Sequence, residues 1–227
     1  FQGLLRSGLI SKLCRKKGGR IVGLSDAREG AGIFYDEVAD VRGRPHAVDR
    51  YLALVEKLGI KMDAPLEWLL PEGDSVPGVE PGYVLLHPFS RGAGKSLSIA
   101  DVQEFCRGLA PYRVVIAGRW DEPLPEIPNA INLLNRTSLA ELIWLLRQAR
   151  FVVSVDSGPM HIAAAITGRL LSLHTWSDPL KVGPYRPEAM VWKDGSLGSV
   201  EEWRSAASRQ AIAQIPEVAD WVRMQLG

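Results

Sequence analysis

The C-terminal two thirds of the chain alternates between two patterns of apolar residues. Short apolar runs rich in β-branched residues recur, and most are separated by longer segments with apolar residues at helical spacing. The runs that we expect to form strands are 83–87, 113–117, 130–134, 151–155 and 170–174. This alternation predicts an α/β fold with a doubly wound parallel sheet.

Two of the intervening helices carry the same start signal. Ser98 with Asp101, and Ser138 with Glu141, each form a capping box, in which the serine and the acidic residue satisfy backbone N–H groups of the first turn. Apolar residues at helical spacing follow each box. In the second helix we expect four of them to face the core, namely Leu139, Leu142, Ile143 and Leu146.

The N-terminal third has a weaker pattern. It predicts a helix with apolar positions 5, 9, 10 and 13, strands near 20–24 and 36–38, and a helix with apolar positions 48, 51, 52, 55 and 58. Residues 60–82 are rich in proline and glycine, which indicates an interdomain linker. We therefore expect an N-terminal domain with linker over 1–76 and a second domain over 77–227. The final helix, around 216–226, is expected to pack back toward the N-terminal part.

Composition narrows the class of protein. The 227 residues carry 27 Lys and Arg against 26 Asp and Glu, a net charge of +1 that does not indicate a nucleic-acid partner. Cys14 and Cys106 make no disulfide framework, and we expect both to be buried small hydrophobes of a reducing, cytoplasmic compartment. No apolar run approaches the roughly 20 residues of a membrane span. No cluster has the spacing of metal ligands, so no metal is expected.

The turn after the strand at 151–155 has the features of an anion site. Asp156, Ser157 and Gly158 end the strand, and Pro159 suits the first turn of the next helix. A helix N-terminus offers free N–H groups and a positive dipole end, and Gly158 leaves room for a ligand to approach. Two plainer interpretations stay open: Asp156 or Ser157 is simply an N-cap, and His161 is a satisfied core histidine.

The loop after the strand at 83–87 has the composition of a phosphate cradle. Ser90, Arg91 and Lys95 stand among glycines between a strand and a helix. The spacing is not that of a Walker A loop, and a solvated loop fits the composition equally well.

The string Val-Ser-Val-Asp-Ser-Gly-Pro-Met-His-Ile-Ala-Ala-Ala, at 153–165, resembles the signature of glycosyltransferase family 9, the bacterial lipopolysaccharide heptosyltransferases. The downstream Thr-Trp-Ser-Asp-Pro at 175–179 and Gly183-Pro184 resemble a second family segment, and the opening 1–7 resembles one that follows the family's third strand. The resemblance implies a GT-B fold of two Rossmann-like domains, the C-terminal one complete and the N-terminal one truncated.

The resemblance also implies roles for residues. Those expected at the donor diphosphate are Ser90, Arg91, Lys95, Asp156, Ser157, Gly158 and His161. Those expected at the nucleoside are Glu122, Thr137, Ser138 and Leu139, although residues 137–139 equally fit plain capping of the next helix. The chain departs from the family in having Leu97 where an aromatic follows the lysine, and prolines 123, 125 and 128 where the family has a helix.

The implied activity is inverting transfer of a heptose or related sugar from an ADP-sugar to a lipopolysaccharide core acceptor at the inner membrane surface, without a cofactor. The family's catalytic base is an aspartate in a segment that we expect upstream of Phe1, so no catalytic residue is named. Two alternatives remain: a catalytically incomplete nucleotide-sugar-binding fragment that needs a partner segment, and a nucleotide-sugar epimerase on a related fold.

Overall fold

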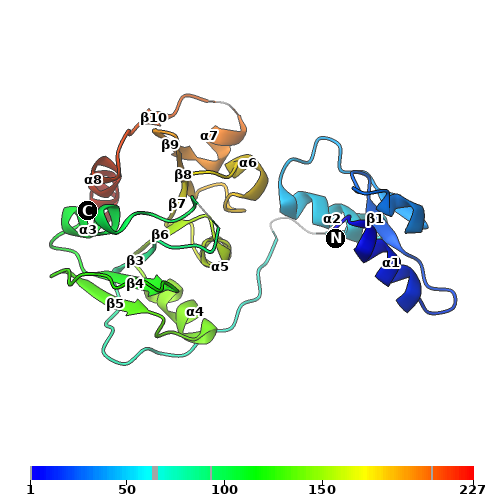
Figure 1. Cartoon of the computed structure of the whole chain (residues 1–227). Coiled ribbons are helices and arrows are strands. Elements are labelled where there is room, and N and C mark those ends of the chain that lie inside the picture. Colours follow the sequence, from blue (N-terminus) through cyan, green and yellow to red (C-terminus); the bar gives the residue numbers. More distant parts are fainter. Residues whose placement is uncertain (1, 63–65, 93, 206) are drawn as a thin grey trace. The chain divides into compact units, whose positions relative to one another are not determined.

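The computed structural model describes residues 2–62, 66–92, 94–205 and 207–227. The chain divides into two compact units, Phe1–Glu67 and Trp68–Gly227 (Figure 1). The division comes earlier than the boundary expected after residue 76, because the intervening segment lies along unit 2. There Arg147 donates hydrogen bonds to the carbonyl oxygens of Leu70 and Pro71, and the Asp74 amide donates to the carbonyl of Ala140.

Unit 1 is built on two short parallel strands. Its elements are α1 (Leu5–Cys14), β1 (Val22–Leu24), the 3-10 helix η1 (Ala31–Phe34), β2 (Glu37–Ala39) and α2 (Ala47–Lys57). The apolar stripe expected along α2 is wrong in detail, because Tyr51 and Leu58 are exposed while Ala53 and Leu54 are buried against the strands. The side chains of the α1 stripe are also exposed, and Gly8 is the buried residue of that helix. Cys14 is likewise exposed, which corrects the expectation that both cysteines are buried.

Unit 2 contains an eight-stranded sheet with the order β10-β9-β8-β7-β6-β3-β4-β5. The strands are β3 (Val84–His87), β4 (Val114–Gly118), β5 (Ala130–Leu134), β6 (Phe151–Val155), β7 (Leu170–His174), β8 (Met190–Lys193), β9 (Ser196–Ser199) and β10 (Gln210–Ala211). The six strands β3 to β8 are parallel, and β9 and β10 add an antiparallel edge. The expected α/β fold with a doubly wound parallel sheet is confirmed.

The helices of unit 2 cover both faces of the sheet (Figure 1). They are α3 (Ile99–Gly108), α4 (Leu139–Gln148), α5 (Gly158–Ile166), α6 (Pro179–Val182), α7 (Val200–Arg204) and α8 (Ile215–Leu226). Alternate strand residues point to opposite faces, so α3 and α8 share one core and α4, α5 and α7 share the other. Both predicted capping boxes are formed. None of the described helices is long and apolar enough to cross a membrane.

Helix α8 packs its apolar face on α3 within unit 2. The expectation that this helix packs back toward the N-terminal part stays a prediction. Gly108 of α3 permits this contact, because a Cβ built there would lie 3.0 Å from the Cβ of Ala219. The buried face of α8 therefore completes the core of unit 2.

The strand order reverses at β3. From β3 the chain proceeds to β4 and β5 in one direction, and then returns to β6, β7 and β8 on the other side. Connections therefore leave the carboxyl ends of β3 and β6 in opposite directions, and open α/β sheets bind ligands in the crevice that this reversal creates.

Helix α4 provides a stability test with a matched pair of substitutions. Leu146 is 2% exposed, whereas Leu139, which we expected to face the core, is 63% exposed. Leu146→Ala should lower the free energy of unfolding by about 2–5 kcal/mol through the cavity that it leaves. Leu139→Ala should change it by less than about 0.5 kcal/mol. Urea denaturation of both variants measures the difference, and equal losses would contradict the orientation of α4.

Candidate functional site

A cavity of about 530 Å³ lies at the carboxyl ends of β3, β4 and β6. This volume is within the range of small-molecule sites. Seven of the predicted site residues line it: Ser90, Arg91, Thr137, Ser138, Leu139, Ser157 and Gly158. The lining also contains residues that the sequence analysis did not select, namely His87, Phe89, Gly118, Arg119, Leu142 and Pro159. The strand reversal thus brings the predicted loops after β3 and β6 together with the start of α4.

His87, the last residue of β3, is buried and lines this cavity. Its Nδ1 is 3.2 Å from the hydroxyl of Ser157, which in turn is 3.3 Å from the hydroxyl of Ser154. Gly118 makes room for the ring, since a Cβ there would lie 2.9 Å from His87 Nε2. Burial lowers the pKa of His87 to about 4, so the ring is neutral at pH 7.

Ser157 precedes the first residue of α5, but its side chain does not cap the helix. Its hydroxyl instead contacts His87 and Ser154, as described above. The capping interpretation of this residue is therefore wrong, and the beginning of α5 faces the cavity with Gly158 exposed and Pro159 in the lining. This arrangement presents the positive end of the helix to a ligand.

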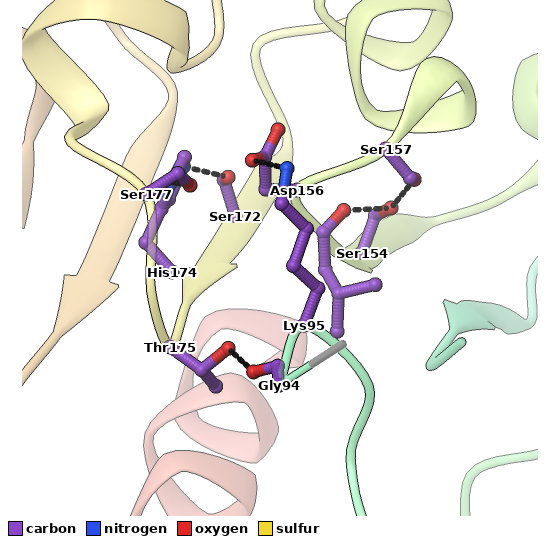
Figure 2. Close-up of polar contacts among 10 residues, drawn as sticks. Gly94, Lys95, Ser154, Asp156, Ser157, Ser172, His174, Thr175 and Ser177 are labelled. Carbon is purple, nitrogen blue, oxygen red and sulfur yellow. Dashed lines mark hydrogen bonds and ion pairs between the residues drawn. The ribbon is translucent and has the colours of Figure 1, made fainter. Parts of the chain in front are cut away.

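Lys95 and Asp156 form an ion pair beside the cavity, with 2.6 Å between Nζ and Oδ2 (Figure 2). The Asp156 side chain is buried. Burial acts to raise its pKa, but hydrogen bonds from Lys95 and Ser177 prevail and hold the pKa below its ordinary value. Asp156 is therefore an ionised carboxylate at neutral pH, and its charge holds the Lys95 ammonium at the end of β6.

A buried histidine that the sequence analysis missed extends this pair. His174 ends β7, with Nε2 2.6 Å from the hydroxyl of Ser172 and Nδ1 2.9 Å from that of Ser177. Burial lowers the pKa of His174 to about 4, so one ring nitrogen donates and the other accepts. Because Ser177 donates to Asp156, it accepts from Nδ1–H, and Ser172 donates to Nε2. Ser172, His174 and Ser177 thus form a chain of hydrogen bonds that continues to the Asp156 carboxylate through Ser177. Figure 2 shows these residues around the Lys95–Asp156 pair.

Two further predicted site residues, His161 and Glu122, do not line the cavity. His161 is exposed on α5, so the interpretation of it as a buried core histidine is wrong. Glu122 is exposed and outside the lining, whereas Arg119 from the same loop lies in it. The loop is held by Asn135, whose Oδ1 accepts from the Trp120 amide at 3.1 Å, and by stacking of Trp120 on Phe89 with ring centroids 4.2 Å apart.

The loop after β3 and the loop after β7 contact each other across β6, the strand that lies between them in the sheet. The Thr175 hydroxyl donates to the carbonyl oxygen of Gly94 at 2.5 Å, and Lys95 Nζ lies 5.5 Å from the centroid of the Trp176 ring. The hydroxyl of Ser96 bonds the backbone of Ser90 and closes the lysine loop on itself. Lys95 is thus held by contacts from both sides of β6.

Comparisons with known proteins show which proteins this chain is similar to. The model of glycosyltransferase family 9 (heptosyltransferase) matches residues 109–209. The lipopolysaccharide core heptosyltransferase OpsX of Haemophilus influenzae is 24% identical over 205 residues, which are 82% of this chain and 58% of the relative. Lipopolysaccharide heptosyltransferase 1 of Salmonella typhimurium is 29% identical over 212 residues, which are 84% of this chain and 64% of the relative.

Within residues 109–209 the chain resembles glycosyltransferase family 9. Of the predicted site residues, those from Glu122 onward lie inside the range that the family model matches, while Ser90, Arg91 and Lys95 precede it. The chain spans 58% and 64% of the length of these two relatives.

Solved structures agree on the fold. The E. coli heptosyltransferase WaaC with ADP has a TM-score of 0.65 at 23% identity, covering 85% of this chain and 64% of that one. E. coli ADP-heptose lps heptosyltransferase II has a TM-score of 0.67 at 22% identity, covering 98% of this chain and 75% of that one. The GT-B expectation for this chain is confirmed at the level of fold.

The two buried histidines make stability depend on pH. Their folded-state pKa values of about 4 lie below the ordinary 6.5, so the unfolded chain binds more protons between these values. The free energy of unfolding should therefore fall as pH decreases through this range, approaching on the order of 3 kcal/mol per histidine below pH 4. His87→Gln and His174→Gln should each flatten the dependence, measured by urea unfolding from pH 4 to pH 7. Slopes identical to wild type would contradict the neutral, buried state of these rings.

Proposed function

We propose that this chain carries the donor side of an inverting glycosyltransferase that moves a heptose or related sugar from an ADP-sugar to a lipopolysaccharide core acceptor. The observation that carries the proposal is the cavity at the strand reversal. It combines the start of α5, a loop with Ser90 and Arg91, and the Lys95–Asp156 pair beside it. The names of the relatives support the sugar and the acceptor, since both are called lipopolysaccharide heptosyltransferases.

We propose that the nucleoside binds at the start of α4. Leu139 presents an exposed apolar side chain there, next to the polar Thr137 and Ser138. An apolar surface with a few polar groups suits a base and its ribose. Glu122 remains the predicted partner of the ribose, with Arg119 in the lining as the charged residue of the same loop.

In the same proposal, the diphosphate binds between the start of α5 and the loop after β3. Gly158 and the α5 amides, the Ser157 hydroxyl, Arg91 and Lys95 would bind its oxygens. Transfer of the sugar breaks its bond to the diphosphate, and the leaving oxygen gains negative charge. Fixed cations and amide dipoles at that place stabilise the transition state, because the charge develops where they already point.

The acceptor side needs a base that removes the proton of the attacking hydroxyl. We assign none of the described residues to this role and expect the base in the family segment that precedes Phe1. A nucleotide-sugar-binding fragment without activity of its own is the second candidate, favoured by the 58–64% coverage of the curated relatives. The epimerase alternative is set aside, because the matches are to heptosyltransferases.

Calorimetric titration with ADP tests the diphosphate site. Lys95→Ala should weaken binding by about 1.5–3 kcal/mol, the range for a hydrogen bond to a charged group, or roughly 10- to 150-fold. Asp156→Ala should also weaken it, because the carboxylate orients Lys95. Lys181→Ala is the matched control, a lysine 68% exposed on α6 with its own partner Asp178. Equal affinity of wild type, Lys95→Ala and Asp156→Ala would contradict the assignment.

Turnover tests the location of the base. The 227-residue chain should bind ADP-heptose and transfer nothing to a lipopolysaccharide core acceptor, because the base is expected outside it. A radiolabelled transfer assay measures this, with a full-length family 9 enzyme as the positive control. Robust transfer by the chain alone would contradict the prediction and would require a base among the described residues.

A further inference from the structure

Trp176 is the most exposed of the described tryptophans near the site. Its side chain is 72% exposed, in the turn between β7 and α6. Trp120 stacks on Phe89, and the indole N–H groups of Trp192 and Trp203 donate to backbone carbonyls. Trp176 lies outside the lining of the cavity, but its ring centroid is 5.5 Å from Lys95 Nζ, so the exposed indole lies next to a residue of the proposed diphosphate site.

The turn that carries Trp176 is fixed on both sides of the ring. Thr175 donates to Gly94 (Figure 2). Ser177 donates to Asp156 and accepts from His174. Asp178 then caps α6, with Oδ1 accepting from the Leu180 amide at 3.0 Å. The backbone at Trp176 is thus positioned before any ligand arrives, and two side-chain torsions are left to settle on binding.

The order of strands gives the direction in which a donor would extend. The proposed nucleoside residues precede α4, beside β4 and β5, and the proposed diphosphate residues follow β3 and β6. The next strand in this direction is β7, and Trp176 follows it. A group attached to the far phosphate would therefore lie over the Lys95–Asp156 pair and against Trp176.

Trp176 also has the chemistry for such a group. The face of an indole ring is negative, as its position beside the Lys95 ammonium reflects. The C–H bonds on one side of a pyranose ring are weakly positive and pack on such a face, while its hydroxyls remain available to Asp156, Lys95 and water. Adenine and ribose meet their proposed partners elsewhere, and of the proposed diphosphate residues only Lys95 is shown in contact with Trp176.

We propose that Trp176 is the wall of the subsite for the transferred sugar and determines the preference of the site for an ADP-sugar over ADP. The inference rests on the proposed function. In this proposal Trp176 contributes to the binding of the sugar and not of ADP. Leu139, by contrast, contributes equally to the binding of ADP and of an ADP-sugar.

Paired titrations with ADP and ADP-heptose test the inference on the 227-residue chain. Trp176→Ala should weaken ADP-heptose by about 5- to 30-fold and change ADP by less than about 2-fold, because the Lys95–Asp156 ion pair persists. Trp176→Phe should retain most of the ADP-heptose affinity through its aromatic face. Leu139→Ala, the matched control, should weaken both ligands by the same factor. Unchanged thermal midpoints will show that the variants fold.

The outcomes distinguish a failure of the role proposed for Trp176 from a failure of the proposed function. If Trp176→Ala weakens both ligands equally, the residue only positions Lys95, and the sugar-wall role is overturned. If it weakens neither ligand, the role is likewise overturned while the proposed function stands. If the wild-type chain binds neither ADP nor ADP-heptose, the proposed function itself fails, and this inference fails with it.

Discussion

The reversal of strand order at β3 is the constraint on which the rest of unit 2 depends. Parallel strands require crossover helices, and those helices bury both faces of β3 and β6. Because successive connections depart in opposite directions at this point, none of the described helices of unit 2 closes over the carboxyl ends of these two strands. The polar groups that end them, His87 and the turn at Asp156, are therefore left to face a cavity rather than a packed core.

Polar side chains at the ends of buried strands need hydrogen-bond partners nearby. His87 shares a hydrogen bond with Ser157, and His174 is bonded by serine hydroxyls on both ring nitrogens. Both rings are neutral because charging them in this environment would cost more than the hydrogen bonds return. The charged groups, Lys95 and Asp156, meet where solvent reaches one of the two partners: the lysine side chain is 24% exposed, the aspartate 7%.

Much of this arrangement could be predicted from the sequence, and the exceptions have physical reasons. Strands β5, β6 and β7 begin and end at the predicted residues. For β6 and β7 the reason is burial, because a buried parallel strand is a short apolar run that ends where polar residues begin. Leu139 fits the apolar stripe of α4 by spacing, yet it occupies the first helical position, beyond the edge of the core. His174 was missed because a single polar residue at a strand end gives no sign of the two serines that it meets in space. The hairpin β8–β9 did have a local signal, the Asp194-Gly195 turn with φ of 49° and 76°, which suits a two-residue hairpin loop.

The Lys95–Asp156 pair couples the position of the Lys95 ammonium to the proton affinity of the Asp156 carboxylate. The ammonium is among the groups that hold the pKa of the buried carboxylate down, against a burial effect that acts to raise it. Any anion that draws the ammonium away, or that settles beside the carboxylate, removes part of that support and raises the proton affinity of Asp156. The hydrogen bond from Ser177, which also contacts His174, does not depend on the ammonium and limits how far the pKa of Asp156 can rise.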